Sequence, residues 1–242
     1  MTWSIVARDP ADGSYGVAVA SRFFAVGALC PHIRPGAGAL STQALINPTY
    51  GPRGLALLNA GYGAGEVLAE MLAGDAGRAA RQLHIVDRQG RVAAHTGVDC
   101  IGWCGHRGDE NLSVAGNMLA GPEVVDATFA TFRQAADRPF AERFLMAMQA
   151  GEAAGGDKRG RQSACLVIHT TEEYPALSLR ADDHVNPLAE LHRLYGISRG
   201  RFAAFMSFLP TRDNPCGIFD RAVIEAEVAR REALLATEGG GV

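Results

Sequence analysis

The chain has 242 residues, of which 48% are hydrophobic and 20% charged, enough apolar material for one large domain or two small ones. A formal net charge of −3, with no basic block, argues against nucleic acid or an anionic membrane surface as the partner. We find no secretory leader and no apolar run long enough to span a bilayer, and the five scattered cysteines suit reduced thiols, so we expect a cytoplasmic protein.

The first 22 residues predict a β-hairpin. Its arms run from Thr2 to Arg8 and from Tyr15 to Arg22, and the segment 9–14 between them contains the turn-forming pairs Asp-Pro and Asp-Gly. Both arms are apolar at nearly every position, which predicts strands that are buried on two faces.

Hydrophobic periodicity predicts the remaining elements. Further strands are expected at 39–44, 83–87, 91–97, 112–119, 163–168 and 174–180. Helices are expected at 52–61, 67–72, 122–132, 140–150, 188–195, 199–208 and 219–236. The segments 31–38 and 99–111 are expected to be irregular. Strands in hairpin pairs, separated by pairs of helices, favour an antiparallel or mixed sheet covered by helices.

No linker is long or polar enough to force a domain boundary. We therefore predict one domain over residues 1–242, with about 188–242 as a helical C-terminal extension of it.

Several spaced blocks stand out over about residues 2 to 195: 2–9, 16–22, Thr42-Gln43-Ala44 with Asn47, 50–54, 116–119, 155–157, 159–164 and Asp182-Asp183-His184. Together they resemble a bacterial and archaeal family of unknown function in the N-terminal-nucleophile (Ntn) hydrolase superfamily. The resemblance implies an α+β fold, a four-layer αββα sandwich of two antiparallel sheets. It also implies a hydrolase-type scaffold without a known substrate.

Thr2 is the first catalytic candidate. If Met1 is removed, the Thr2 hydroxyl and a free α-amine sit on one residue, and an amine with a pKa of about 7.7–8.0 can accept the hydroxyl proton. A retained Met1 blocks that amine. The alternative is structural, because a β-branched residue that begins a strand needs no catalytic explanation.

Three further residues are candidates for the catalytic group. Arg22, at the end of the hairpin, can stabilise the amine and an oxyanion, with Asp9 orienting it, or both can be solvated residues at a strand end and a turn. Asn117 and Asp183 belong to the family-like blocks. If Thr2, Arg22, Asn117, Arg159 and Asp183 line one pocket, the enzymatic hypothesis gains support; if they are scattered, it fails.

Two segments are candidates for substrate binding. Thr42, Gln43 and Asn47 follow or end an apolar strand and can bind a polar group, although Asn47-Pro48 also suits a turn. The loop that contains Asp157, Arg159, Arg161 and Gln162 leads into a buried strand. Arginine forks recognise carboxylate or phosphate, which favours an anionic substrate, but charged loops are often only solvated.

The segment Asp182-Asp183-His184 suits proton transfer, metal binding or a helix cap before Pro187, and His184 is also a candidate for substrate binding. The cysteines in 100–106 lack a second ligand pair at zinc-binding spacing, so we predict no metal, and no glycine-rich segment predicts a cofactor.

The sequence thus favours hydrolysis of an amide bond, peptide or non-peptide, in a small polar or anionic substrate. One alternative is a non-catalytic ligand-binding or assembly protein, and another is a hydrolase that uses Asp182, Asp183 and His184. Apolar residues of the C-terminal helices serve either as core or as the interface of a homo-oligomer. They are Phe202, Phe205, Met206 and Phe208.

Overall fold

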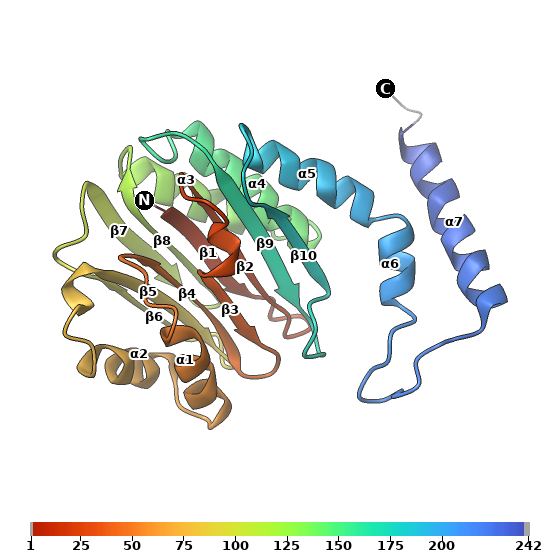
Figure 1. Cartoon of the computed structure of the whole chain (residues 1–242), viewed down its shortest axis with the longest axis horizontal. Helices are drawn as coiled ribbons and strands as arrows, with labels where there is room; N and C mark the ends of the chain where they lie inside the picture. Colours follow the sequence, from red (N-terminus) through yellow and green to blue (C-terminus); the bar gives the residue numbers. More distant parts are fainter. Residues whose placement is uncertain (1, 240–242) are drawn as a thin grey trace. The chain divides into compact units, whose positions relative to one another are not determined.

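The computed structural model describes residues 2–239 (Figure 1). Its strands are β1 (Thr2–Arg8), β2 (Tyr15–Ser21), β3 (Pro31–Arg34), β4 (Gly38–Ala44), β5 (Arg81–Asp87), β6 (Val92–Thr96), β7 (Trp103–Asp109), β8 (Leu112–Leu119), β9 (Ser163–His169) and β10 (Leu177–Ala181). Its α-helices are α1 (Tyr50–Asn59), α2 (Ala64–Ala73), α3 (Pro122–Gln134), α4 (Phe140–Ala153), α5 (Pro187–Ser198), α6 (Arg201–Met206) and α7 (Arg221–Gly239). Two short 3-10 turns, Val26–Ala28 and Arg78–Ala80, lie in the connections.

The strands form two antiparallel sheets. The larger sheet has the order β10-β9-β2-β1-β8-β7, and the smaller has the order β3-β4-β5-β6. The predicted hairpin β1–β2 lies at the centre of the larger sheet, where β1 pairs with β2 on one side and β8 on the other.

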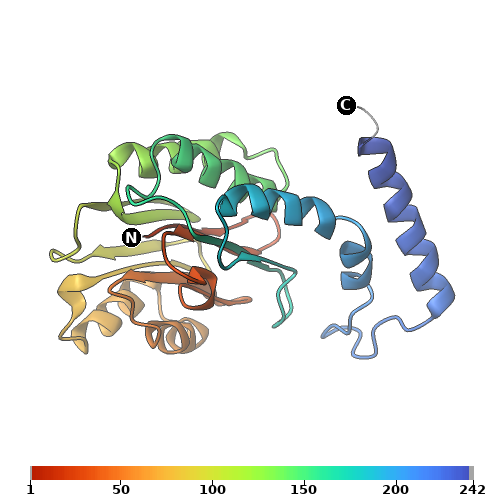
Figure 2. The ribbon, with the colours of Figure 1, turned by 45° about the horizontal axis from the view of Figure 1, so that its top comes forward.

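Helices cover the outer face of each sheet. Helices α3 and α4 pack on the larger sheet, α1 and α2 pack on the smaller one, and β1 and β8 lie against β4 and β5 (Figure 2). The predicted four-layer αββα sandwich of the α+β class is confirmed.

Side chains of β1 alternate between two buried layers. Ser4 reaches the smaller sheet, and Val6 joins an apolar cluster between the sheets that includes Val17 and Val86. Trp3 points the other way, toward α4, where its indole lies close to Gly151. Both faces of the strand are therefore covered, as its nearly continuous apolar sequence predicts.

A second apolar cluster fixes the smaller sheet to its helices. Leu40 and Leu83 of the sheet pack with Leu58 of α1 and with Val67 and Met71 of α2. These helical residues recur at the spacing that predicted an apolar face.

Two segments that we expected to be irregular are edge strands. β3 pairs only with β4, and its Pro31 stands at the first position, where a missing N–H is tolerated. β7 pairs only with β8, and its residues are half-buried or exposed. Backbone hydrogen bonds to one neighbour hold such strands, so their side chains need no apolar pattern.

The chain divides into two compact units, Met1–Leu191 and His192–Val242. Within the second unit α6 and α7 pack together around Ala204, Phe208 and Val228. Phe208 is thus core, whereas Phe202 and Phe205 are more than a third exposed. The single-domain and homo-oligomer hypotheses stay predictions. Of the described helices, none has the length and apolarity to cross a bilayer.

Gly16 of β2 gives a test of packing between the larger sheet and α4. A Cβ at this position would lie 2.5 Å from the Phe144 ring, whereas a Cβ at Gly65 of α2 meets nothing within 4 Å. We expect Gly16→Ala to lower the free energy of unfolding by about 1–3 kcal/mol. The matched Gly65→Ala should leave it unchanged or raise it by up to about 1 kcal/mol. Urea unfolding of both variants measures this, and equal stabilities would contradict the packing described.

Candidate functional site

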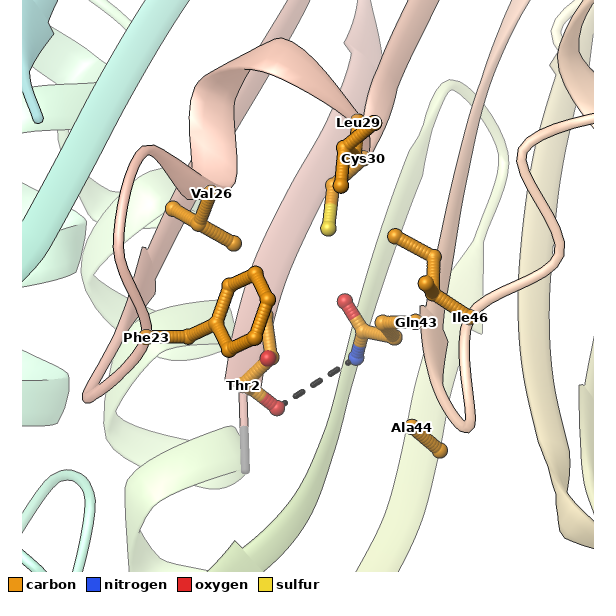
Figure 3. Close-up of a pocket in the computed structure, with 8 residues that line it drawn as sticks. All are labelled: Thr2, Phe23, Val26, Leu29, Cys30, Gln43, Ala44 and Ile46. Atoms are coloured by element: carbon orange, nitrogen blue, oxygen red, sulfur yellow. Dashed lines mark hydrogen bonds between the residues drawn. The ribbon is translucent and has the colours of Figure 1, made fainter.

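Thr2 lies where the two sheets meet at one end of β1. Its neighbours across the larger sheet are Ser21 of β2 and Asn117 of β8. The Thr2 hydroxyl donates to the Ser21 hydroxyl at 3.1 Å, and the Thr2 carbonyl accepts from the Asn117 amide at 3.4 Å. The Thr2 carbonyl also accepts from the Gln43 amide at 3.4 Å (Figure 3). The backbone and the side chain of Thr2 are therefore both held in place.

Three buried amides form the centre of this arrangement. Gln82 Oε1 accepts from Gln43 Nε2 at 2.7 Å and from Asn117 Nδ2 at 2.9 Å. The Gln82 Nε2 group donates to the carbonyl of Gly116 at 2.8 Å. Since all three side chains are buried, these bonds replace the water that the amides lose on folding.

A buried histidine continues the network between the sheets. His84 lies between two serines, with Nε2 2.7 Å from the Ser4 hydroxyl and Nδ1 2.9 Å from the Ser113 hydroxyl. The Ser4 hydroxyl also donates to Gln43 Oε1 at 2.6 Å. Burial lowers the pKa of His84 to about 3, so the imidazole is neutral and one ring nitrogen accepts while the other donates.

A small apolar cavity of about 70 Å³ lies beside Thr2 (Figure 3). Its lining residues are Thr2, Phe23, Val26, Leu29, Cys30, Gln43, Ala44 and Ile46. Burial raises the pKa of the Cys30 thiol far above its usual range, so this group is a neutral part of the wall. The arrangement places a hydroxyl at an apolar cavity.

The backbone around Thr2 has unusual torsion angles. Ala44 has φ 68° and Met118 has φ 55°, and each directly follows an amide residue that holds the Thr2 carbonyl. Ala25, with φ 50°, precedes the cavity residue Val26. Left-handed backbone is unfavourable for residues with a Cβ and is concentrated at functional sites. Its presence here favours a functional role for this end of the sandwich.

Arg22 does not join Thr2 at this cavity. Its backbone N–H donates to Asp157 at 2.9 Å, and its guanidinium donates to the carbonyl of Arg159. Asp9 lies at the opposite end of the hairpin, where it pairs with Arg143 at 3.7 Å. The expectation that Asp9 orients Arg22 is wrong, because strand β1 separates them by its full length.

The predicted anion-binding loop is largely occupied by its own contacts. Asp157 is buried, forms an ion pair with Arg159 at 3.2 Å and accepts the Arg159 backbone N–H at 2.8 Å. Arg161 pairs with Glu152 of α4. These contacts join the loop to β2 and α4, so Asp157 has a structural role in place of the predicted contact with substrate.

Asp182, Asp183 and His184 do not act as one group. Asp182 accepts from Arg180 at 2.8 and 2.9 Å, and His184 Nδ1 accepts the backbone N–H of Asn186 at 3.0 Å. Asp183 accepts from Gln162 at 3.3 Å. Among the described residues no group of three or more His, Cys, Asp or Glu side chains is arranged to hold a metal ion.

Most of the predicted site residues therefore lie in one of two places. Arg22, Arg161, Gln162, Asp183 and His184 line a separate surface recess of about 500 Å³. Thr2, Gln43 and Asn117 lie together at the end of the sandwich. The expectation that all catalytic candidates share one pocket is wrong, because Ser21 and Arg22, although adjacent in sequence, contact different parts of the molecule.

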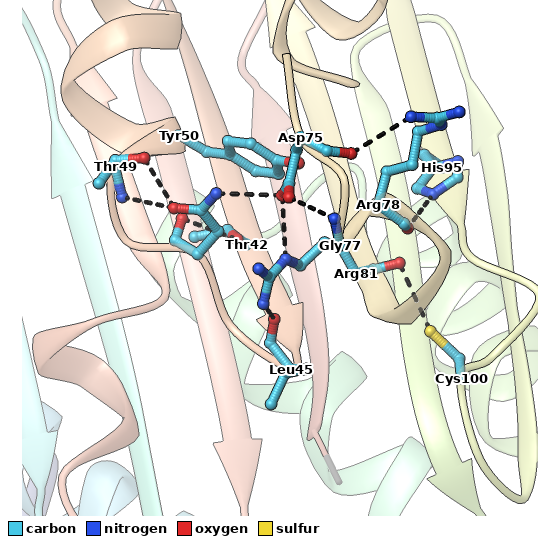
Figure 4. Close-up of polar contacts among 11 residues, drawn as sticks. Thr42, Leu45, Thr49, Tyr50, Asp75, Gly77, Arg78, Arg81, His95 and Cys100 are labelled. Atoms are coloured by element: carbon cyan, nitrogen blue, oxygen red, sulfur yellow. Dashed lines mark hydrogen bonds and ion pairs between the residues drawn. The ribbon is translucent and has the colours of Figure 1, made fainter. Parts of the chain in front are cut away.

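Asn47 belongs to a cluster around Asp75, which sequence reasoning missed. Figure 4 shows Asp75 of this cluster with Tyr50 and Arg81. Asp75 Oδ2 accepts from Tyr50 at 2.7 Å, from Arg81 at 3.0 Å and from Asn47 at 3.2 Å. The Tyr50 hydroxyl and Arg81 hold the pKa of Asp75 well below its usual range. Burial and the nearby Asp75 carboxylate raise the pKa of Tyr50 to about 12.

Thr42 is fully buried, and its hydroxyl donates to the Asn47 carbonyl at 3.3 Å. Thr42 and Asn47 thus stabilise the connection between β4 and α1 instead of meeting a substrate as predicted. The local cue for Asn47 was the Asn-Pro turn, where its side chain accepts the Thr49 backbone N–H at 3.1 Å.

A family model described as "Family of unknown function (DUF1028)" matches residues 2–191. The chain belongs to this family. Among solved structures, this DUF1028 protein is similar to SPO2555 from Silicibacter pomeroyi, also described as DUF1028, with 31% identity and a TM-score of 0.84 over 91% of this chain and 96% of that one. A much weaker likeness is to Anbu (ancestral beta-subunit) from Yersinia bercovieri, with 14% identity and a TM-score of 0.38 over 86% and 98%. Among curated proteins, none matches the chain.

Sequence reasoning missed several residues of the candidate site around Thr2. Ser21, Cys30, Gln82 and His84 contribute to it but were not assigned a role. A usable signal existed in the two strands β1 and β5, where Ser4, Gln82 and His84 occupy alternating positions of otherwise apolar runs. Polar residues at period two in strands buried on both faces indicate an internal hydrogen-bond network.

His84 predicts a pH dependence of stability in this DUF1028 protein. Its folded-state pKa is about 3, below an ordinary unfolded value of about 6.5, so its contribution is complete above pH 6.5 and is lost as the pH falls toward 3. This loss amounts to about 1.4 kcal/mol per pH unit inside that window. Between pH 6 and pH 4, the free energy of unfolding of the wild type should therefore fall more steeply than that of His84→Gln, by this amount per pH unit.

Urea unfolding at a series of pH values measures the difference. The matched control is His95→Gln, since His95 of β6 is only half-buried. This variant should still lose stability between pH 6 and pH 4, because it retains His84. Parallel curves for wild type and His84→Gln would overturn the assignment of a buried neutral imidazole.

Asp75 gives a second test of stability. Asp75→Asn removes the charged acceptor shared by Tyr50 and Arg81. We expect the free energy of unfolding to fall by about 1–3 kcal/mol in chemical denaturation. Glu70→Gln, an exposed carboxylate on α2, is the control and should change it little. Equal effects of the two substitutions would show that the cluster does not stabilise the fold.

Proposed function

We propose that this DUF1028 protein hydrolyses an amide bond by Ntn-type chemistry, with Thr2 as nucleophile once Met1 is removed. The observation that carries the proposal is the position of the Thr2 hydroxyl at an apolar cavity, with its backbone held by two buried amides. Met1 lies outside the described residues, so its removal is part of the proposal.

The surroundings of Thr2 suit this chemistry. A nucleophile needs a fixed position, and the hydrogen bonds from Gln43 and Asn117 to its carbonyl supply it. The Ser21 hydroxyl, 3.1 Å away, limits the rotation of the Thr2 side chain. Gln43 and Asn117 are positioning residues in this scheme, because their amides contact Thr2 and Gln82.

The reaction needs no group beyond Thr2 and water. The free α-amine takes the proton of the Thr2 hydroxyl as its oxygen attacks the substrate carbonyl. The tetrahedral intermediate collapses, the C–N bond breaks, and the departing amine takes the proton from the α-ammonium group. Water then attacks the resulting ester, which releases the carboxylic acid and restores the Thr2 hydroxyl.

The scheme that placed Arg22, Arg159 and Asp183 in one pocket with Thr2 fails, and the present proposal is a narrower one. Arg22 lies in the separate recess, so the proposal gives it no role in stabilising charge at the Thr2 hydroxyl. Arg159 and Arg161 are paired with Asp157 and Glu152, which gives no specific support to an anionic substrate. The proposal therefore rests on Thr2 and the residues that touch it.

The test combines the mass of the native protein with labelling by a β-lactone, whose ring opening forms an ester on an activated hydroxyl. We expect a mass without Met1 and one adduct, located on Thr2 by fragmentation. The labelling rate should rise through about pH 7–8, because the amine acts as a base only when neutral. Thr2→Ser should keep the adduct and Thr2→Ala should lose it.

Thr49→Ala is the matched control, since Thr49 is an exposed threonine outside the cavity. It should be labelled as the wild type is. Uniform retention of Met1, or unchanged labelling of Thr2→Ala, would rule out Thr2 as the nucleophile. Retained Met1 together with thermal stabilisation by an anionic metabolite without turnover would support the non-catalytic alternative.

A further inference from the structure

The cavity beside Thr2 has the chemistry of an aliphatic binding site. Val26 and Cys30 are buried in its wall, and Phe23 and Ile46 flank it (Figure 3). The Gln43 amide, one of its two polar lining side chains, already bonds to Ser4 and Gln82. A polar group that entered the cavity would lose water and gain few hydrogen bonds, which favours an apolar occupant.

Its volume limits the size of that occupant. An apolar cavity of about 150 Å³ accepts benzene. The cavity beside Thr2 measures about 70 Å³, slightly less than half of that volume, so it has room for about three carbon atoms. An isopropyl group, or the branched end of an isobutyl group, fits this volume, whereas an aromatic ring or a long acyl chain exceeds it.

The position of Thr2 sets the direction in which a substrate enters. Because Thr2 itself lines the cavity, a group seated there brings the carbonyl attached to it close to the Thr2 hydroxyl. Ala44 also lines a second, larger recess of about 330 Å³, together with Asn117 and Met118. That recess leaves space for the part of the substrate beyond the carbonyl.

We infer that the cavity binds the short branched aliphatic group next to the scissile carbonyl. The substrate class is then an amide of a short branched acid, or of a residue with a valine-like or leucine-like side chain. This inference rests on the proposed role of Thr2 and adds to it the identity of the acyl group.

The experiment is a titration of the full chain with simple amides, followed by the NMR shifts of the Val26 and Ile46 methyl groups. Acetamide, isobutyramide, isovaleramide and benzamide are the probes. Affinity should rise about fourfold with each added carbon from acetamide to isovaleramide, as expected for burial of apolar carbon. Benzamide should bind more weakly than isovaleramide, because its ring exceeds the volume.

Two adjacent phenylalanines supply a matched pair of variants. Phe23 lines the cavity, whereas its exposed neighbour Phe24 does not. Phe23→Ala should weaken isovaleramide binding at least fivefold, and Phe24→Ala should leave it within twofold of the wild type. Ile46→Ala enlarges the cavity and should shift the preference toward benzamide.

Equal affinity across the series, or shifts that avoid the cavity methyl groups, would overturn the inference. So would equal effects of Phe23→Ala and Phe24→Ala. The titration measures binding without turnover, so its failure is distinct from a failure of Thr2 labelling. Selective binding without a Thr2 adduct would overturn the acyl assignment and leave an aliphatic ligand site.

Discussion

Pairing of buried amides between the two sheets is the interaction on which this end of the molecule depends. Gln43 and Gln82 come from the smaller sheet and Asn117 comes from the larger one, and each amide loses its water on folding. A buried polar group without a partner costs about 1–3 kcal/mol. The three side chains therefore fix the stagger of the sheets at the point where β1 begins. Gln43 and Asn117 also donate to the Thr2 carbonyl. The contacts that align the sheets therefore also fix the position of Thr2, the hydroxyl residue that begins β1.

Left-handed backbone at Ala44 and Met118 follows from this arrangement. Gln43 and Asn117 point inward near the ends of β4 and β8, and the next residues of these strands, Ala44 and Met118, have left-handed torsion angles. A connection that contains Phe23, Val26 and Cys30 closes the space on one side with apolar groups. Ala44 lines the cavity and Met118 lines the neighbouring recess, which is consistent with backbone strain being retained at a site of binding or chemistry.

Local patterns predicted much of the fold but less of the site. The hairpin, the strand pairs β5–β6 and β9–β10, and most helices follow from apolar periodicity, and the αββα layers followed from the family-like blocks. β3 and β7 escaped prediction because an edge strand is held by its backbone, which leaves its side chains free of a pattern. Thr2 and Asn117 were predicted as catalytic and Gln43 as substrate-binding, and the three lie together in the structure. Arg22, Asp157 and Asp183 lie elsewhere, since charged or polar side chains next to conspicuous blocks can bind one another instead of facing the same cavity.

The amino-acid sequence was sufficient to indicate two-sided burial of β1, because a strand that is buried on both faces has apolar residues at nearly every position. It also indicated that a hydroxyl residue begins that strand. Which polar groups meet Thr2 was decided only by the tertiary structure. The Thr2 carbonyl accepts from Asn117, 115 residues away, and from Gln43 on the other sheet. Such contacts depend on strand register and on the stagger of two sheets, and these are set by packing of the whole core, not by any local run of residues.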